Sequence, residues 1–420
     1  MPMNLSVSSE QTKRESWEYF LFRAAWEISL SQAQYEKIEQ RYSQLERILN
    51  ASDNPLLAEA HIFVQGSMGL RTTIKPVSGA PEDLDTIDAD AIIWLPHAQG
   101  ASAQEVLDAI EERFNAGSRV YEKIKQLRRG VRIVYADENP GFHIDVTPAR
   151  AINGNSQSRG DGKLEVPDRE NGWKASTPRP YSHWLQIASA ETISLEENLV
   201  VAKSERAYDS TTQDPLPQYG EYLDQDPLRA TIKLLKRHRD EWAIRTQNEN
   251  HRPISAVITT LATHAYLDVV QESKSKPLRP LDAILKIVQK MRDHIKQRGN
   301  EYLVCNPADD GENFAEKWNR PLDGRRYRQA FFQWHDNATA SISLGLESLS
   351  ADSFTKAIKE NFGIGPTFIS AVNREIPANY TMPGRPDGTT RNSISMGALF
   401  GDGSATANSQ EDVKPVGRLG

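Results

Sequence analysis

Apolar residues at helical spacing dominate the beginning of the chain. Between Glu15 and Asn50 they recur every three or four positions, as in amphipathic helices, and a short break falls near Ser29–Ser31. The two resulting stripes consist of Trp17, Phe20, Leu21, Ala24 and Ile28, and of Tyr35, Ile38, Tyr42, Leu45 and Ile48. The pattern predicts a long N-terminal helix that bends or restarts at the break. The preceding residues, 1–15, are polar and expected to be mobile.

Strand patterns follow in the next hundred residues. Short apolar runs bounded by turn residues lie at 60–66, 86–95, 130–137 and 141–149, with one helical pattern from Gln104 to about Phe114. Residues 150–180 are rich in Gly, Asn, Ser, Arg and Pro and are expected to form a long loop. Residues 16–180 are therefore predicted to form an α/β lobe with a mixed sheet, which also carries the long N-terminal helix.

The remainder of the folded chain has helical character. Helices are expected near 181–206, 226–246, 253–272, 281–297, 312–340 and 349–360. From about residue 375 the sequence is rich in Pro, Gly, Ser, Asn and Asp, and residues 375–420 are predicted to form a flexible tail. The predicted fold class is α+β, in two lobes, with a helical C-terminal lobe at 181–374.

Composition excludes several classes of protein. The formal net charge is −7, from 50 basic and 57 acidic residues, which argues against broad binding to nucleic acid. The single cysteine, Cys305, rules out an intrachain disulfide and a cysteine-based zinc site, and indicates a reducing cytoplasm. No run of about 18 apolar residues predicts a membrane span.

Two aspartates in the sequence IDADAII are the first candidates for chemistry. Side chains alternate along a strand, so Asp88 and Asp90 share one face. Two carboxylates on one face repel each other and favour hard divalent cations with oxygen ligands. A second pair, Asp83 and Asp85, lies just upstream in an acidic loop with no apolar run directly after it, and is interpreted as a decoy.

A third carboxylate lies on a later strand. In FHIDVTP the apolar residues form one face and Asp145 lies on the other, together with His143. Asp145 beside the first pair would complete a site for two metal ions. His143 is interpreted as a structural hydrogen-bonding partner in preference to a ligand.

A strand-to-helix turn precedes the carboxylates. The strand at 60–66 ends in Gln65, Gly66 and Ser67, where glycine permits close approach of a phosphate and the serine hydroxyl can bind it. Many such turns contain Gly-Ser without binding a phosphate. Gln65 either touches the nucleotide or only completes the strand.

The order Gly-Ser, Asp-x-Asp, Asp is the pattern of polymerase-β-like nucleotidyltransferases. The segments VQGSMGLRTTIKP, DADAIIWLP, FHIDVTPA, DPLRATIKLLKRHRD and RPISAVITTLATHAY resemble successive blocks of the bacterial cGAS/DncV-like nucleotidyltransferases (CD-NTases). These enzymes are the cyclic-oligonucleotide synthases of CBASS anti-phage systems. The resemblance runs from about residue 60 to residue 320. It implies that Lys236 and Ser255 contact the triphosphate.

The resemblance also implies an activity. Asp88, Asp90 and Asp145 would hold two Mg²⁺ ions, or Mn²⁺, and the enzyme would make a cyclic di- or trinucleotide from ATP, alone or with another nucleoside triphosphate. Cyclic tri-AMP is the favoured product. No nucleic acid or membrane is needed, a HORMA-type or ubiquitin-like-ligation partner would regulate the enzyme, and a downstream effector would respond to the product. The residues alone also permit a nucleotidyltransferase acting on RNA, protein or a small molecule, or an inactive nucleotide-binding scaffold.

Overall fold

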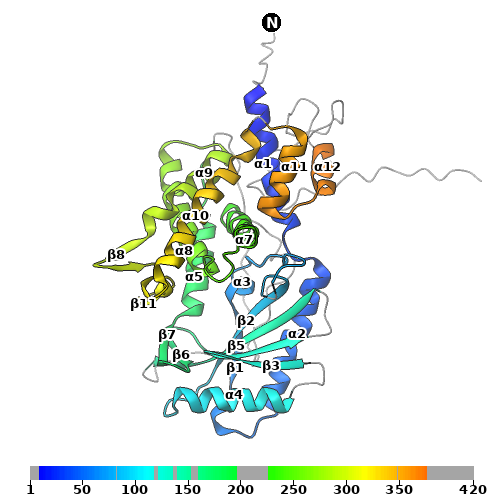
Figure 1. Ribbon diagram of the computed structural model, residues 1–420. Coiled ribbons are helices and arrows are strands. Elements are labelled where there is room, and N and C mark those ends of the chain that lie inside the picture. The colour runs from blue at the N-terminus through cyan, green and yellow to red at the C-terminus, as the bar shows by residue number, and fades with distance from the viewer. Residues whose placement is uncertain are drawn as a thin grey trace, which may run out of the picture.

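A computed structural model of the protein describes residues 9–81, 83–117, 122–135, 140–152, 159–195, 226–347 and 349–375. Figure 1 shows a sheet with helix α4 along one face and a group of helices above the other. Among the described residues, no helix combines the length and the apolar character needed to cross a bilayer.

The sheet has seven strands and mixed direction. Its strands are β1 (His61–Gln65), β2 (Thr86–Trp94), β3 (Glu122–Leu127), β4 (Gly130–Tyr135), β5 (Gly141–Ala151), β6 (Leu164–Asp168) and β7 (Gly172–Ser176). The main path runs β1-β2-β5-β4-β3, and β6 joins β5 to β7. Only β2 and β5 pair in parallel among these strands, and every other pair is antiparallel. The expected mixed sheet is thus confirmed.

The two faces of this sheet differ in chemistry. Helices α2 (Gln32–Asn50) and α4 (Ala103–Gly117) share a core with one face, to which β2 contributes Ile87, Ala89 and Ala91. Because side chains alternate, Asp88 and Asp90 belong to the opposite face. That face also carries a small apolar cluster that includes Phe63 and Ile92.

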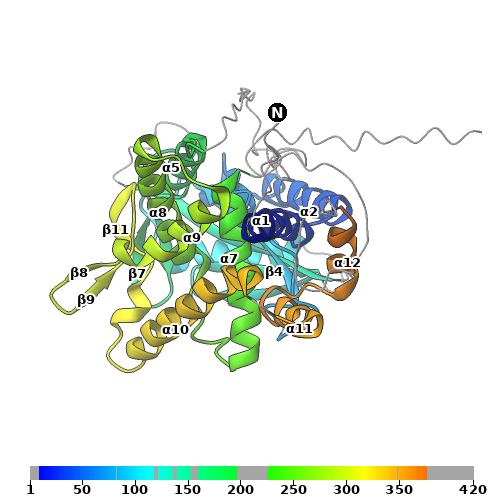
Figure 2. The same ribbon diagram turned by 90° about the horizontal axis from the view of Figure 1, so that it is seen from above.

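Helix α7 is the centre of the helical layer, and Figure 2 shows the other helices around it. The layer consists of α1 (Ser9–Glu27), α5 (Pro178–Ala190), α7 (Pro227–Thr246), α8 (Ser255–Ser275), α9 (Pro280–Lys290), α10 (Gly324–Ile342), α11 (Ala351–Phe362) and α12 (Pro366–Glu375). The carboxylate of Asp226 caps α7 by accepting a hydrogen bond from the Arg229 amide at 2.8 Å, and Pro227 opens the helix.

Short elements complete the chain. They are the 3₁₀ turns η1 (Pro55–Leu57), η3 (Met291–His294), η4 (Glu316–Asn319) and η5 (Leu344–Leu346), and the two-stranded ribbons β8 (Lys296–Arg298) with β9 (Glu301–Leu303) and β10 (Cys305–Asn306) with β11 (Asp309–Asn313). The expectation of helix at 281–297 and 312–340 was therefore too long at both places. Met291 starts a 3₁₀ turn, and α10 begins only at Gly324, after Pro321.

The N-terminal helical region differs from the prediction, because only its second helix packs on the sheet. The break at residues 29–31 is real: α1 ends at Glu27, and Ser31 caps α2. The apolar stripe of α1, which contains Trp17 and Phe20, packs with the helical layer and not with the sheet, whereas α2 packs on the sheet. Residues 9–15, expected to be mobile, already belong to α1.

Residues 150–180 also differ from the expected long loop. The strands β6 and β7 form a hairpin there, because Leu164 and Val166 alternate into the small cluster with Phe63. Each strand has only five residues, and the Gly and Asn residues on both sides are typical of a loop, so the alternation of apolar and polar residues was too short to predict a hairpin. The expected helix beyond α5 and the expected tail lie outside the described residues, which omit 196–225 and 376–420.

Candidate active site

Four polar side chains meet where the parallel strands β2 and β5 pair. The register places Asp88 opposite His143 and Asp90 opposite Asp145. All four lie on the face turned away from α2 and α4, since their neighbours in sequence enter the core with those helices. One carboxylate oxygen each of Asp88 and Asp145 and one ring nitrogen of His143 lie within 4.8 Å of one another. The alternation in the sequence predicted this shared face.

Asp90 lies against the backbone of Gly66. Strand β1 pairs with β2 so that Gln65 is opposite Asp90, and the next residue, Gly66, has a φ of +59°. Burial raises the pKa of Asp90 well above its usual range, and the charges of Asp88 and Asp145 raise it further. A cation placed among the three carboxylates would relieve this repulsion.

Arg132 is the direct partner of Asp145. It lies opposite Asp145 on β4, and its Nε and a terminal nitrogen donate to the two carboxylate oxygens at 2.6 and 2.8 Å. Burial raises the pKa of Asp145 even though the bonds from Arg132 oppose this. Arg132 was not among the residues predicted from the sequence, although the alternation in GVRIVY places it on the same face.

Asp88 is the most accessible of the three carboxylates, with a side chain that is 54% exposed. Its Oδ1 lies 2.8 Å from Nε2 of His143, a side chain that is almost fully buried. Burial of the surroundings disfavours the charged carboxylate, but the close imidazole outweighs this and lowers the pKa of Asp88.

The Gly-Ser turn lies directly beside the carboxylates. It forms the single helical turn α3 (Gly66–Gly69) after β1. The hydroxyl of Thr73 donates to Oγ of Ser67 at 3.0 Å, and the Thr72 amide donates to the Ser67 carbonyl at 2.8 Å. The structure therefore brings Gln65 and Gly66 next to Asp90, with Ser67 following in the same turn.

Basic residues of α7 reach the segment that follows this turn. Lys236 donates to the carbonyl of Thr72 at 2.8 Å. Arg229 donates to Leu70 at 2.9 Å and Arg237 to Lys75 at 2.6 Å. All three basic side chains are buried, so α7 does not present them to solvent. Satisfying backbone carbonyls explains how these charges tolerate burial.

The charge of Lys236 interacts with the carboxylates of the site. Burial lowers its pKa to about 8, the nearby Arg239 lowers it further, and the carboxylates of Asp240, Asp88 and Asp90 oppose the shift. Ser255, the first residue of α8, accepts a hydrogen bond from Arg239 at 3.0 Å. The partner of Ser255 in α7 is therefore Arg239, three residues after Lys236.

Asp83, from the carboxylate pair in the loop before β2, has a partner of its own. Asp83 forms an ion pair with Arg252 at 2.7 Å, which joins the loop before β2 to the segment before α8. The interpretation of Asp83 and Asp85 as a decoy stays a prediction. The donor set of Asp88, Asp90, Asp145 and His143 fits a divalent cation, because carboxylate oxygens and imidazole nitrogen are ordinary ligands of such ions.

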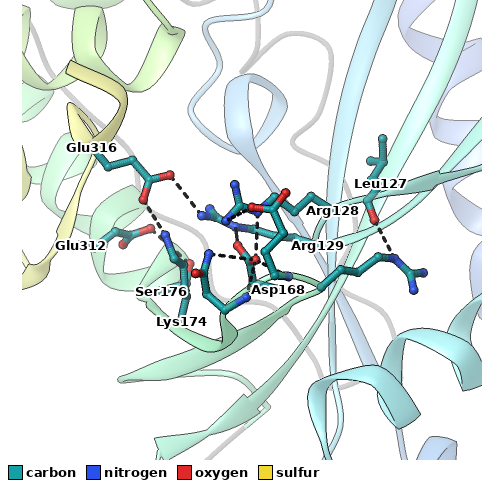
Figure 3. A network of polar contacts seen from close by, with 11 residues as sticks. Leu127, Arg128, Arg129, Asp168, Lys174, Ser176, Glu312 and Glu316 are labelled. Atoms are coloured by element: carbon teal, nitrogen blue, oxygen red, sulfur yellow. Dashed lines mark hydrogen bonds and ion pairs between the residues drawn. The ribbon is translucent and has the colours of Figure 1, made fainter. Parts of the chain in front are cut away.

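A second polar network fastens the sheet to the helical layer (Figure 3). The fully buried carboxylate of Asp168 accepts hydrogen bonds from Arg128 at 2.9 Å and Arg129 at 3.1 Å. Burial disfavours its charge, but these bonds prevail and lower its pKa. Arg129 and Lys174 also pair with Glu316 of η4, at 3.2 and 2.6 Å. This junction joins the β3–β4 turn and the β6–β7 hairpin to η4.

Comparison with known proteins identifies the fold. Residues 18–188 match the family described as "Second Messenger Oligonucleotide or Dinucleotide Synthetase domain". A "c-di-GMP synthase" of Roseivirga ehrenbergii is 24% identical over 322 residues, which cover 75% of each chain. The CD-NTase CdnG of Bradyrhizobium diazoefficiens, solved in complex with GTP, has a TM-score of 0.59 at 17% identity and covers 85% of this chain and 98% of its own.

The mixed sheet and the helical layer together are similar in fold to this CD-NTase. Residues 18–188 thus have the sequence of a second-messenger oligonucleotide or dinucleotide synthetase domain, which is the class of enzyme that the family's description names. The resemblance drawn from the sequence is therefore confirmed, as is the predicted α+β fold.

Proposed function

We propose that the protein joins nucleoside triphosphates into a cyclic dinucleotide, with Asp88, Asp90 and Asp145 as the catalytic residues. The observation that carries this proposal is the register of β2 and β5. It places Asp90 opposite Asp145 and Asp88 two residues away on the same face, beside the Gly66 turn. Three carboxylates so close on one face favour a cation-dependent reaction of a polyphosphate.

Each residue has a distinct task in this reaction. Divalent cations, when bound, neutralise the triphosphate and acidify the attacking hydroxyl. Asp88 and Asp90 of β2 hold the donor triphosphate through them, with Mg²⁺ or Mn²⁺ as the ions and two as their number. Asp145 would join these residues in holding the cation at the attacking hydroxyl, with its carboxylate oriented by Arg132.

The phosphate contacts come from the turn and from α7. Gly66, whose backbone lies against Asp90, would present the turn to the phosphates, and Gln65 and Ser67 flank it. An ammonium has three N–H donors, and Lys236 uses one of them on Thr72, so two remain for phosphate oxygens. Ser255 would bind the same phosphates from the start of α8. We also propose that the folded chain divides into two lobes, a catalytic lobe at 16–180 and a helical lobe at 181–374.

The proposed product contains guanine. The named activity of the Roseivirga relative favours GTP as a substrate over ATP alone. Cyclic tri-AMP, the product favoured from the sequence, has no support in that relative and becomes the competing outcome. An anti-phage role within CBASS, regulation by a HORMA-type or ubiquitin-like-ligation partner and a downstream effector are likewise proposals that rest on the family.

One incubation tests the proposal. The purified protein receives ATP, GTP, CTP and UTP, singly and in pairs, with Mg²⁺ or Mn²⁺ and no other acceptor. Mass spectrometry of phosphatase-resistant products should show a cyclic dinucleotide that requires GTP. A cyclic tri-adenylate would overturn the base and ring size. Products that form only when RNA or protein is added would overturn self-contained synthesis.

A further inference from the structure

His143 has a buried ring nitrogen that the fold does not satisfy. The residue is 4% exposed, and its Nε2 has no hydrogen-bond partner among the described residues. The contact of this nitrogen with Asp88 Oδ1 is short, at 2.8 Å, but it lacks the geometry of a hydrogen bond. A buried polar atom without a partner calls for an explanation, because such atoms are costly.

The surroundings of this nitrogen point to a cation. Nε2 of His143 and oxygens of Asp88 and Asp145 lie within 4.8 Å of one another. Around an ion with bonds of about 2.1 Å, neighbouring ligand atoms lie roughly 3 Å apart and opposite ones roughly 4.2 Å apart. The observed 2.8 Å between Nε2 and Oδ1 suits two neighbouring ligands of one ion.

A purely structural role explains the arrangement less well. A histidine that only orients Asp88 would direct a ring N–H along the line to the carboxylate oxygen, which this one does not. The backbone of His143 pairs with β2 on one side and with β4 on the other, so these strands fix the position of its Cα and Cβ atoms. Arg132 already donates to both oxygens of Asp145, so His143 is not needed to hold that carboxylate in place.

We propose that His143 Nε2 is a direct ligand of one catalytic cation, together with Asp88 and Asp145, and that this nitrogen makes the site prefer Mn²⁺ to Mg²⁺. Mg²⁺ is a hard ion that binds oxygen almost exclusively, whereas Mn²⁺ also accepts imidazole nitrogen. The inference rests on the proposed function, because it assumes that the same carboxylates hold the cation.

Direct spectroscopy tests the nitrogen bond without reference to catalysis. The full-length protein is loaded with Mn²⁺ without nucleotide, and electron spin echo envelope modulation is recorded. Nitrogen coupling should be present in the wild type and should change when the histidines carry 15N. It should disappear in His143→Gln and persist in His183→Gln, a control on the exposed surface of α5. Absence of nitrogen coupling in wild-type protein that binds Mn²⁺ overturns the proposal.

Calorimetry tests the preference between the ions. His143→Gln replaces the nitrogen with an amide oxygen or nitrogen, and the ratio of the Mg²⁺ to the Mn²⁺ dissociation constant should fall about tenfold or more. An unchanged ratio overturns the claim. Should His143→Gln fail to fold, the 15N labelling of the wild type still shows whether a histidine nitrogen binds the Mn²⁺ ion. Cyclic dinucleotide synthesis without nitrogen coupling removes only the His143 assignment, whereas coupling without synthesis removes only the proposed function.

Discussion

Gly66 and Asp90 lie so close that a side chain cannot fit between them. A Cβ atom added to Gly66 would lie 2.0 Å from Oδ2 of Asp90 and 2.7 Å from its carboxyl carbon. The φ of +59° at Gly66 is also a conformation that residues with side chains rarely adopt. The turn and the carboxylate are therefore positioned by each other.

Gly66→Ala should remove most of the activity. The methyl group must displace Asp90, and a displacement of about 1 Å at a catalytic group costs on the order of a hundredfold in rate. Gly79→Ala is the matched control, because Gly79 has a φ of +77° with nothing within 4 Å of an added Cβ. Both variants should lose about 1–2 kcal/mol of stability from the backbone alone. Equal activities in the two variants would contradict the importance of the Gly66–Asp90 contact.

The double variant Asp88→Asn with Asp90→Asn should be folded and inactive. Removing two carboxylates that repel one another should leave the metal-free melting temperature unchanged or raised, because burial and then the charge of Asp88 raise the pKa of Asp90. Asp83→Asn with Asp85→Asn is the comparison, and it should keep most of the activity. Product assays and thermal unfolding of both proteins decide, and near-normal activity in the first variant would refute the assignment.

Lys236→Met should weaken nucleotide binding more than Arg237→Met does. Both variants lose one bond from α7 to a backbone carbonyl, so both should be less stable. Only Lys236 is proposed to meet the phosphates, and the loss of one charge-assisted contact is worth roughly 1.5–3 kcal/mol, or about 10–100-fold in affinity. Titration calorimetry with a non-hydrolysable triphosphate measures this difference. Equal losses in affinity would leave Lys236 with a structural role alone.

Glu18 should make stability depend on pH. Burial raises its pKa from 4.5 to about 7, although it accepts a bond from the Leu281 amide at 3.0 Å. Between these values the native state keeps a proton that the unfolded state has lost, so stability falls as pH rises through that window, by up to about 3 kcal/mol. Glu18→Gln should remove this fall and be the more stable protein at about pH 8.

Chemical denaturation at several pH values tests the Glu18 prediction. Glu39→Gln, on the exposed face of α2, serves as the control and should follow the wild type. A Glu18→Gln variant with the same pH dependence as the wild type would contradict the prediction.

The sequence predicted the carboxylate face for a simple reason. Alternation along β2 and β5 is a local property, and it is sufficient to place Asp88, Asp90 and Asp145 on one side of each strand. The Gly-Ser turn was equally local. What remained open was the pairing of distant strands, which decides that Asp90 lies opposite Asp145.

Contacts between distant segments were less accessible. The helical pattern at 226–246 predicted α7, but the burial of Lys236 depends on the carbonyl of Thr72, more than a hundred residues earlier. Arg132 could have been found by applying to β4 the alternation rule used for β5. The packing of α1 depended on tertiary partners that a helical stripe does not specify.

The three bonds from α7 to the carbonyls of Leu70, Thr72 and Lys75 also limit how this enzyme can be recombined with its relatives. The catalytic turn continues into a segment whose backbone is held by side chains of another part of the fold. In a chimaera that takes the sheet from one parent and the helices from another, this segment and α7 would have to be inherited together.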